Sequence, residues 1–270
     1  MSSTTSAEES RPAATAARIY DYILGGTHNF PADRAAAQAM IQLAPVIVAS
    51  ARTNRAFLRR SVRYLLDQGV HQFLDIGSGI PTVGNVHEVA ADARVVYVDI
   101  DPVAVAESQE ILQGHDGATA LRGDLREPAA ILDHPDVRRL LDLGQPVGLL
   151  LVAVLHFVNE DDVAYDVVAR LMAELAPGSH LVISHAALPE IADDDLRASV
   201  DDAQGIYRSR TATPLALRDR AGVTRFFDGL ELVEPGLVWV PQWRPAPDDP
   251  TDFAADPSEC SLYAGVGRLP

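Results

Sequence analysis

Residues 72–79 (QFLDIGSG) constrain the fold of this chain most, because an apolar strand ends there in an acid and two glycines follow at once. Gly77 and Gly79 have no side chain, so the backbone can turn sharply and a ligand can lie against bare main chain. Such a turn indicates a nucleotide-type pocket. Asp75 then restricts the ligand, since a carboxylate before the glycines suits a cofactor that carries an ammonium and a sulfonium better than a pyrophosphate.

Two further acids follow predicted strands. The run 94–102 (RVVYVDIDP) reaches Asp99 roughly 20 residues after the glycines, the spacing at which a second strand places a carboxylate on a ribose diol. Asp124 follows another short apolar run, where its side chain can accept from an adenine amine. The predicted cofactor-binding residues are Asp75, Gly77, Ser78, Gly79, Asp99, Ile100, Asp124 and Leu125.

A dinucleotide site is the first alternative. The pattern G-x-G-x-x-G fits only as far as Gly79, because the third glycine position is Thr82 and Pro81 stands before it. The pair G-x-G alone is also explained by a tight turn without a ligand. The three ordered acids favour S-adenosylmethionine.

The series of glycines and acids resembles that of the class I S-adenosylmethionine-dependent methyltransferases. From about Arg18 to its end the chain also resembles an actinobacterial family of S-adenosyl methyltransferases, formerly of unknown function. This closer match rests on residues 18–30 (RIYDYILGGTHNF), 51–60 (ARTNRAFLRR), 72–81 with 84–88 (GNVHE), 150–158 (LLVAVLHFV) and 230–236 (LELVEPG). The resemblance implies a Rossmann-like α/β fold with a seven-stranded, mostly parallel sheet and an antiparallel last strand. The chain departs from the general class I pattern at Pro81, where a third glycine is common.

The composition limits partners and location. A chain of 270 residues with 47% hydrophobic residues can form one α/β domain, and a formal net charge of −16 disfavours nucleic acid as a partner. Cys260 is the only cysteine, so an intramolecular disulfide is impossible. The longest apolar run, 147–158, is too short to span a bilayer. We expect a cytoplasmic protein without a membrane partner, and the sequence indicates no oligomeric state.

Periodicity divides the chain into three parts. Residues 1–17 are predicted to be a disordered tail, 18–69 a helical cap or lid, and 70–270 an α/β core of the same domain. Strands are expected at 73–76, 95–99, 119–122, 147–154, 181–185, 230–240 and 262–266, and helices at 32–43, 46–68, from about 83, from Asp101 as N-cap, and at 161–175. Ligands of such sheets bind beyond the carboxyl ends of the strands.

His156 is the candidate catalytic base. It follows an apolar strand at the end that faces the ligand, and histidine titrates near neutral pH. The alternative is a hydrogen-bonded histidine that only completes the strand end. Methyl transfer needs little acid or base help when the acceptor is already nucleophilic, because a sulfonium is an activated leaving group.

Residues 20–30 contain two tyrosines, an aspartate and two glycines besides His28 and Asn29, and cannot be a regular helix throughout. Because the resemblance makes this segment a family signature, we expect Tyr22, His28 and Asn29 to line the cofactor or acceptor site in a lid. The alternative is an amino-terminal strap that Tyr20 and Phe30 pack in place.

The arginines and the histidines give no indication of a functional site. The arginines of residues 52–63 lie on a predicted helix, where a solvated face is expected rather than an anion site. The histidines show no metal-binding spacing, so no metal is predicted.

The sequence therefore predicts an S-adenosylmethionine-dependent methyltransferase that acts on an unidentified small molecule. Two alternatives stay open: a non-catalytic protein that senses the cofactor, and a nicotinamide-dependent oxidoreductase.

Overall fold

One sheet of eight strands organises the part of the chain that the computed structural model describes, namely residues 14–81, 84–188 and 215–270. The strand order is β3-β2-β1-β4-β5-β8-β6, and β7 pairs with β8. The strands are β1 Gln72–Ile76, β2 Arg94–Asp99, β3 Ala118–Arg122, β4 Gly148–Val152, β5 His180–Ala186, β6 Glu231–Leu232, β7 Val238–Trp239 and β8 Leu262–Arg268. The first five are parallel and β8 is antiparallel to β5. This confirms the predicted fold class.

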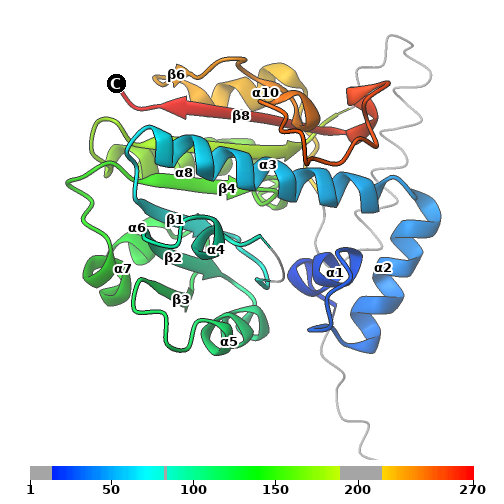
Figure 1. The fold of residues 1–270 in the computed structure, drawn as a ribbon, viewed down its shortest axis with the longest axis horizontal. Coiled ribbons are helices and arrows are strands. Elements are labelled where there is room, and N and C mark those ends of the chain that lie inside the picture. The colour runs from blue at the N-terminus through cyan, green and yellow to red at the C-terminus, as the bar shows by residue number, and fades with distance from the viewer. Residues whose placement is uncertain (1–13, 82–83, 189–214) are drawn as a thin grey trace, which may run out of the picture.

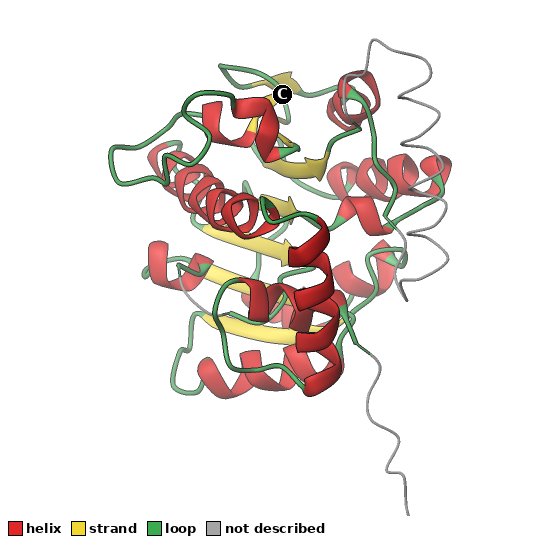
Figure 2. Cartoon of the chain, turned by 90° about the vertical axis from the view of Figure 1, so that its right-hand side faces the viewer, coloured by secondary structure: helices red, strands yellow, loops and turns green. Residues whose placement is uncertain are grey.

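Helices cover both faces of the sheet (Figures 1 and 2). The α-helices are α1 Ala16–Ile23, α2 Pro31–Leu43, α3 Ile47–Asp67, α4 Val86–Val89, α5 Pro102–Ile111, α6 Pro128–Leu132, α7 Pro135–Leu140, α8 Asp161–Ala173 and α10 Arg220–Thr224. Short 3-10 helices are η1 Leu155–Phe157, η2 Arg225–Phe227, η3 Val240–Gln242 and η4 Pro257–Cys260. The side chain of Asp101 accepts from the N–H of Val103, 2.9 Å away, and caps α5 as predicted.

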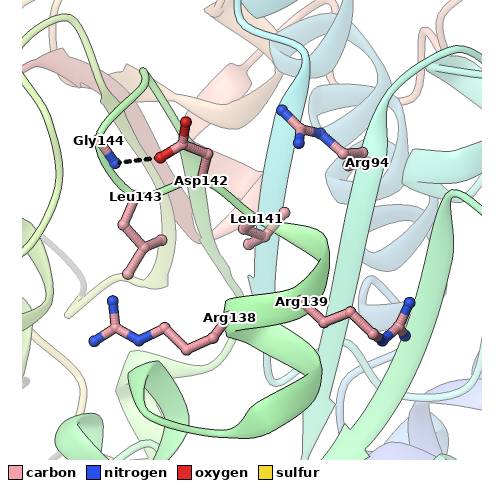
Figure 3. Close-up of a pocket in the computed structure, with 7 residues that line it drawn as sticks. All are labelled: Arg94, Arg138, Arg139, Leu141, Asp142, Leu143 and Gly144. Carbon is pink, nitrogen blue, oxygen red and sulfur yellow. Dashed lines mark hydrogen bonds between the residues drawn. The ribbon is translucent and has the colours of Figure 1, made fainter.

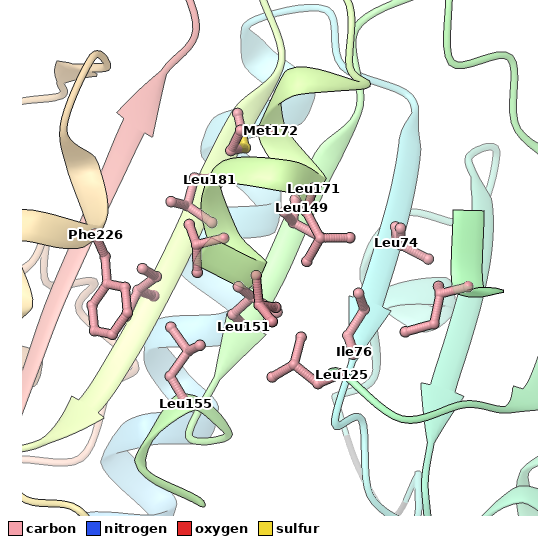
Figure 4. Packing of buried hydrophobic residues seen from close by; sticks show 14 of the residues in the cluster. Leu74, Ile76, Leu125, Leu149, Leu151, Leu155, Leu171, Met172, Leu181 and Phe226 are labelled. Carbon is pink, nitrogen blue, oxygen red and sulfur yellow. The ribbon is translucent and has the colours of Figure 1, made fainter. Parts of the chain in front are cut away.

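Alternate residues of the central strands form two hydrophobic layers, because successive side chains of a strand point to opposite faces. Leu74, Leu149 and Leu181 pack on one face with Leu171 and Met172 of α8 (Figure 4). The other face carries Phe73, Val95, Tyr97, Leu150 and Val182, which pack against Phe57, Val62 and Leu65 of α3. Asp75 follows Phe73 by two residues and therefore belongs to the face covered by α3.

The long helix α3 packs against the sheet and contributes to its hydrophobic core. Trp243, from the segment between β7 and β8, is fully buried against Phe57 with ring centroids 5.4 Å apart. Arg60 is buried too, donates to the carbonyl of Trp243 at 2.8 Å and pairs with Asp249 at 2.5 Å. The predicted solvated face is therefore wrong for Arg60, whereas Arg52 is exposed.

The helices α1 and α2 lie beyond the carboxyl ends of the parallel strands (Figure 1). Arg18 of α1 is buried and pairs with Asp33 of α2 at 2.9 Å and with Asp101, after β2, at 2.8 Å. In the described ranges no single helix is long and apolar enough to cross a membrane, and only the bent pair α2 and α3 passes that test by length and composition. The predicted location, and the division into tail, cap and core, stay predictions.

Some local predictions differ from the structure. The expected strand 230–240 is split into β6 and β7, because Pro235 and Gly236 form a turn between them. The helix expected from about 83 is the short α4, which the Asn85–Glu88 capping box begins, and residues 82–83 lie outside the described part. Of the predicted tail, residues 1–13 lie outside it as well, and α1 begins at Ala16.

Candidate functional site

The glycine loop after β1 bends toward β2. Gly77 and Gly79 have φ angles of +74° and +65°, in the left-handed region that favours glycine. The N–H groups of Gly77 and Ser78 both donate to the carbonyl of Val98, at 2.8 and 3.2 Å. A Cβ on Gly77 would lie 2.2 Å from the side chain of Val154, whereas a Cβ on Gly79 would meet nothing within 4 Å. One glycine therefore permits close packing, and the other leaves the loop surface open.

Asp99 connects this loop to the next strand tip. Its two carboxylate oxygens accept from the N–H groups of Gly79 and Asp101, both at 2.8 Å. Burial raises the pKa of Asp99, while these backbone hydrogen bonds lower it. Each oxygen has a second lone pair, so the side chain can still accept from a ribose hydroxyl. The neighbouring Ile100 is 52% exposed, which leaves an apolar surface for a ring beside Asp99.

Asp75 is a buried carboxylate without a hydrogen bond to any residue of the described ranges, although it is only 5% exposed. Burial raises its pKa to about 7, against the attraction of the Arg55 charge. Tyr97 is the neighbour of Asp75 in β2. Its hydroxyl accepts from the backbone N–H of His87 at 2.9 Å and makes no hydrogen bond to Asp75. A carboxylate in such a place is stabilised by a cationic partner.

Asp124 and Leu125 lie after β3. The carboxylate of Asp124 receives the guanidinium and the backbone N–H of Arg126, and hydrogen bonds from this side chain lower its pKa. The side chain of Leu125 is buried in the same hydrophobic layer as Ile76. Any contact of Asp124 with an amine would therefore share the carboxylate with Arg126.

The predicted acceptor residues of the amino-terminal segment point in different directions. Tyr22 accepts from Gln38 of α2 at 3.0 Å and belongs to the small cluster between α1, α2 and α3. Asn29 is buried and donates to Asp21 at 2.8 Å. His28 is partly exposed and lies 3.3 Å from Glu107 of α5.

Asp21 holds this segment in shape. One of its oxygens accepts from the backbone N–H of His28 at 2.9 Å and from the side chain of Asn29. A Cβ on Gly26 would lie 2.0 Å from the same carboxylate, so the chain approaches it more closely than any other residue would allow. Asn29 therefore contributes to the internal order of the segment.

His156 lies in a buried network behind the ends of β4 and β5. Its Nδ1 accepts from the backbone N–H of Ala186 at 3.3 Å, and its ring is 5.6 Å from that of His185. Arg218 contacts His185 at 2.8 Å and pairs with Asp161 at 2.8 Å. Burial, and then the positive charges that His185 and Arg218 bring, lower the pKa of His156 well below its usual value.

The turn before His156 is strained. Ala153 has a φ of +58°, which is uncommon for a residue with a side chain. This turn follows β4 directly and places Val154 against Gly77. The strain therefore occurs where β4 meets the glycine loop.

Three residues where α1 meets α3, Tyr20, Asn54 and Arg55, were not among the predicted site residues. Tyr20 of α1 donates from its hydroxyl to the carbonyl of Ala51 at 3.2 Å and receives the amide of Asn54 at 3.2 Å. The guanidinium of Arg55 lies over the Tyr20 ring, 5.8 Å from its centroid. The sequence suggested packing for Tyr20 only as the alternative to a lid, and it suggested a solvated helix face for Arg55. Only the way α1 crosses α3 brings the two side chains together.

The hollow in Figure 3 lies at the opposite, amino end of the strands, where Arg94 begins β2. It is lined by Arg94, Arg138, Arg139, Leu141, Asp142, Leu143 and Gly144. Arg138 and Arg139 already pair there with Asp133 and Asp136. Within the described part of the chain, no group of three His, Cys, Asp or Glu side chains could hold a metal ion.

Comparison with known proteins places this geometry in a family. A family model described as S-adenosyl methyltransferase matches residues 2–270. The chain belongs to this family. It is 40% identical to a candidate methyltransferase from Thermobifida fusca YX, with 95% of each chain covered and a TM-score of 0.84. It is 39% identical to a DUF574 family protein from Streptomyces avermitilis MA-4680, with coverage of 96% and 98% and a TM-score of 0.85. No match was found among curated proteins.

A more distant likeness supports the fold alone. Magnesium protoporphyrin IX methyltransferase from Synechocystis PCC 6803, solved with bound S-adenosylhomocysteine, is 17% identical over 93% of both chains with a TM-score of 0.52.

Membership of the S-adenosyl methyltransferase family makes the chain an S-adenosylmethionine-dependent enzyme. The residues present fit that cofactor: the loop surface at Gly79 is open, and the buried carboxylate of Asp75 lacks a partner among the described residues. When bound, the cofactor supplies an activated methyl group, and the chain's own residues bind and orient it.

Proposed function

We propose that this enzyme transfers the methyl group of S-adenosylmethionine to a small-molecule acceptor. The observation that carries this proposal is the unpartnered, buried carboxylate of Asp75 beside the open glycine loop and Asp99. A cationic amino-acid part suits Asp75, and a ribose diol suits Asp99. The formal net charge of −16 supports a small acceptor over nucleic acid.

The proposed cofactor site keeps all the residues predicted from the sequence. Asp75 binds the ammonium, the loop residues Gly77, Ser78 and Gly79 offer bare main chain, and Asp99 binds the ribose. Ile100 packs on the adenine from its exposed position, and Asp124 and Leu125 border the adenine at the end of β3. These eight roles rest on position and chemistry together.

The amino-terminal segment is proposed to close the acceptor side. His28 lies at its rim near Glu107, whereas Tyr22 and Asn29 act by holding the segment in shape through α2 and Asp21. This division combines the two alternatives raised by the sequence, a lid and a packed strap.

For His156, the geometry favours the hydrogen-bonded role over that of a base. Because Nδ1 accepts from a backbone N–H, the neutral ring carries its proton on Nε2 and can donate there but not accept. The lowered pKa keeps the ring neutral at pH 7. We infer that water, and not His156, takes any proton that the acceptor loses.

Binding and turnover test this function separately. Isothermal titration should give micromolar affinity for S-adenosylhomocysteine and none for NAD, and the reverse result would favour the oxidoreductase. Methyl-labelled S-adenosylmethionine, incubated with a native metabolite extract, should then label a compound of low molecular mass. Binding without any labelled product would support the non-catalytic sensor, and label in a macromolecular fraction would contradict a small acceptor. The Gly79→Val variant is the negative control.

A further inference from the structure

Arg55 is a charged side chain whose guanidinium has no acidic partner among the described residues. It lies half-buried on α3, and it makes no hydrogen bond or ion pair with any residue that the structure describes. Its Nε is buried and unpartnered there. The guanidinium lies over the face of the Tyr20 ring, which contacts it from one side and leaves its N–H groups without acceptors among the described residues.

Asn54, the preceding residue, is incomplete in the same way. It is 2% exposed, and its amide nitrogen donates to the Tyr20 hydroxyl, yet its Oδ1 has no donor among the described residues. A buried amide oxygen without a donor is unfavourable, and such atoms cluster at ligand sites. Asn54 and Arg55 therefore leave one acceptor and one set of donors unsatisfied beside the same tyrosine.

Asp75 faces this pair from the sheet. Phe73 of β1 and Phe57 of α3 belong to one buried cluster, and Asp75 and Arg55 each lie two residues from these phenylalanines, so α3 carries Arg55 over the face of the sheet that holds Asp75. The charge of Arg55 also acts on Asp75. No ion pair joins Arg55 to Asp75, however. The buried Arg18 and Arg60 differ, since each contacts an acid directly. Arg55 and Asp75 thus lie on the facing elements α3 and β1 without forming an ion pair.

A ligand between them must offer a cation to one side and an anion to the other. The α-amino and α-carboxylate groups of an amino acid are joined through one carbon and meet both needs. Resting on the proposed function, we propose that Arg55 binds the α-carboxylate of the methionine part of the cofactor, while Asn54 and Asp75 accept from its ammonium. The site would thereby select the complete cofactor over nucleosides that lack the amino-acid part.

The test compares two ligands that differ only in that part. S-adenosylhomocysteine carries the amino acid, and 5′-methylthioadenosine keeps the adenine, ribose and sulfur without it. Isothermal titration with the full chain measures both affinities for the wild type, Arg55→Met, Arg55→Lys and Arg52→Met. Arg52 is an exposed arginine on the same helix and controls for the loss of one positive charge. Circular dichroism confirms that each variant is folded.

In Arg55→Met, the affinity for S-adenosylhomocysteine should fall about 10- to 100-fold, the usual loss of a charged hydrogen-bond partner, while that for 5′-methylthioadenosine stays within about twofold. Arg55→Lys should lie between, because lysine keeps the charge but not the planar fork. Arg52→Met should change neither ligand. An equal loss of both ligands in Arg55→Met would overturn the proposal and leave the proposed function intact. If neither ligand binds the wild type, both fail together.

Discussion

Replacing Asp75 by asparagine should make the free protein more stable and, at the same time, lower its affinity for the cofactor. In the absence of a ligand, Asp75 is a buried carboxylate without a hydrogen bond from the described residues, so its charged form is unfavourable. Asparagine has nearly the same shape and no charge. The change therefore removes the unfavourable burial of a charge in the free protein, and it also removes the proposed partner of the cofactor's ammonium.

The size of the effect follows from the pKa of Asp75, which burial raises from 3.8 to about 7. Below pH 3.8 the group is protonated in both the folded and unfolded protein, and the free energy of unfolding carries no penalty. As the pH rises toward 7, the unfolded chain loses its proton first and the folded state loses relative stability; above pH 7 the penalty is complete. Three pKa units correspond to about 4 kcal/mol as an upper limit.

Thermal unfolding of the wild type and Asp75→Asn at pH 5 and pH 8 measures this. At pH 8 the variant should be more stable by about 1 to 4 kcal/mol, a rise in Tm of roughly 2 to 4 °C per kcal/mol for a chain of this size, and the gap should narrow at pH 5. Titration at pH 8 should show at least about a tenfold loss of affinity for S-adenosylhomocysteine in the variant. Wild-type affinity should itself fall about tenfold from pH 8 to pH 6, as the carboxylate takes up a proton.

Asp99→Asn is the matched control, since Asp99 accepts two backbone hydrogen bonds and its replacement should lower stability at pH 8. The reasoning is refuted if Asp75→Asn is the less stable protein at pH 8, or if it binds S-adenosylhomocysteine as tightly as the wild type does.

Three further changes test other parts of the site. Gly79→Val should abolish S-adenosylhomocysteine binding in titration, because its side chain would occupy the open loop surface, whereas Gly114→Val, at an exposed glycine of similar φ, should share the backbone strain and still bind. Arg18→Met should lower the free energy of unfolding by about 3 to 5 kcal/mol in urea, since it leaves two buried carboxylates without their cation; the exposed Arg170→Met should cost less than about 1 kcal/mol, and equal losses would refute the buried role. His156→Gln keeps a hydrogen-bond donor, so the variant should retain most of kcat with an unchanged pH profile. If the pH profile of the variant loses its limb near neutral pH, His156 acts as the general base after all.

The sequence predicted the sheet well because its signals are local. The strand ending at Ile76, the acid at Asp99 and the N-cap at Asp101 each depend on a few neighbouring residues, and each has its predicted place. The antiparallel last strand followed from the resemblance to a known family, not from periodicity. Where a turn interrupts an apolar run, as Pro235 does, periodicity alone joined two short strands into one.

The candidate site was predictable only in part, for a different physical reason. Asp75 and Gly79 can be recognised because they follow a predicted strand. The position of the Arg55 guanidinium depends instead on α1 crossing α3 and on the ring of Tyr20. In the sequence, Arg55 and the buried Arg60 look like the exposed Arg52. Helical periodicity gives each residue a face, yet it does not state which other segment will cover that face.

The ion pairs of Arg18 connect the first helix to the proposed cofactor site. Asp101 receives Arg18 and caps α5, its N–H is held by Asp99, and Asp99 holds the N–H of Gly79. These groups form one continuous series from α1 to the glycine loop. Exchange of the amino-terminal helices between relatives, as a route to a new acceptor, therefore has to keep this arginine. A transplanted helix without it would leave Asp101, next to the proposed ribose position, without its cation. Diversity of acceptors within this architecture is accordingly expected in residues that surround this series rather than in its members.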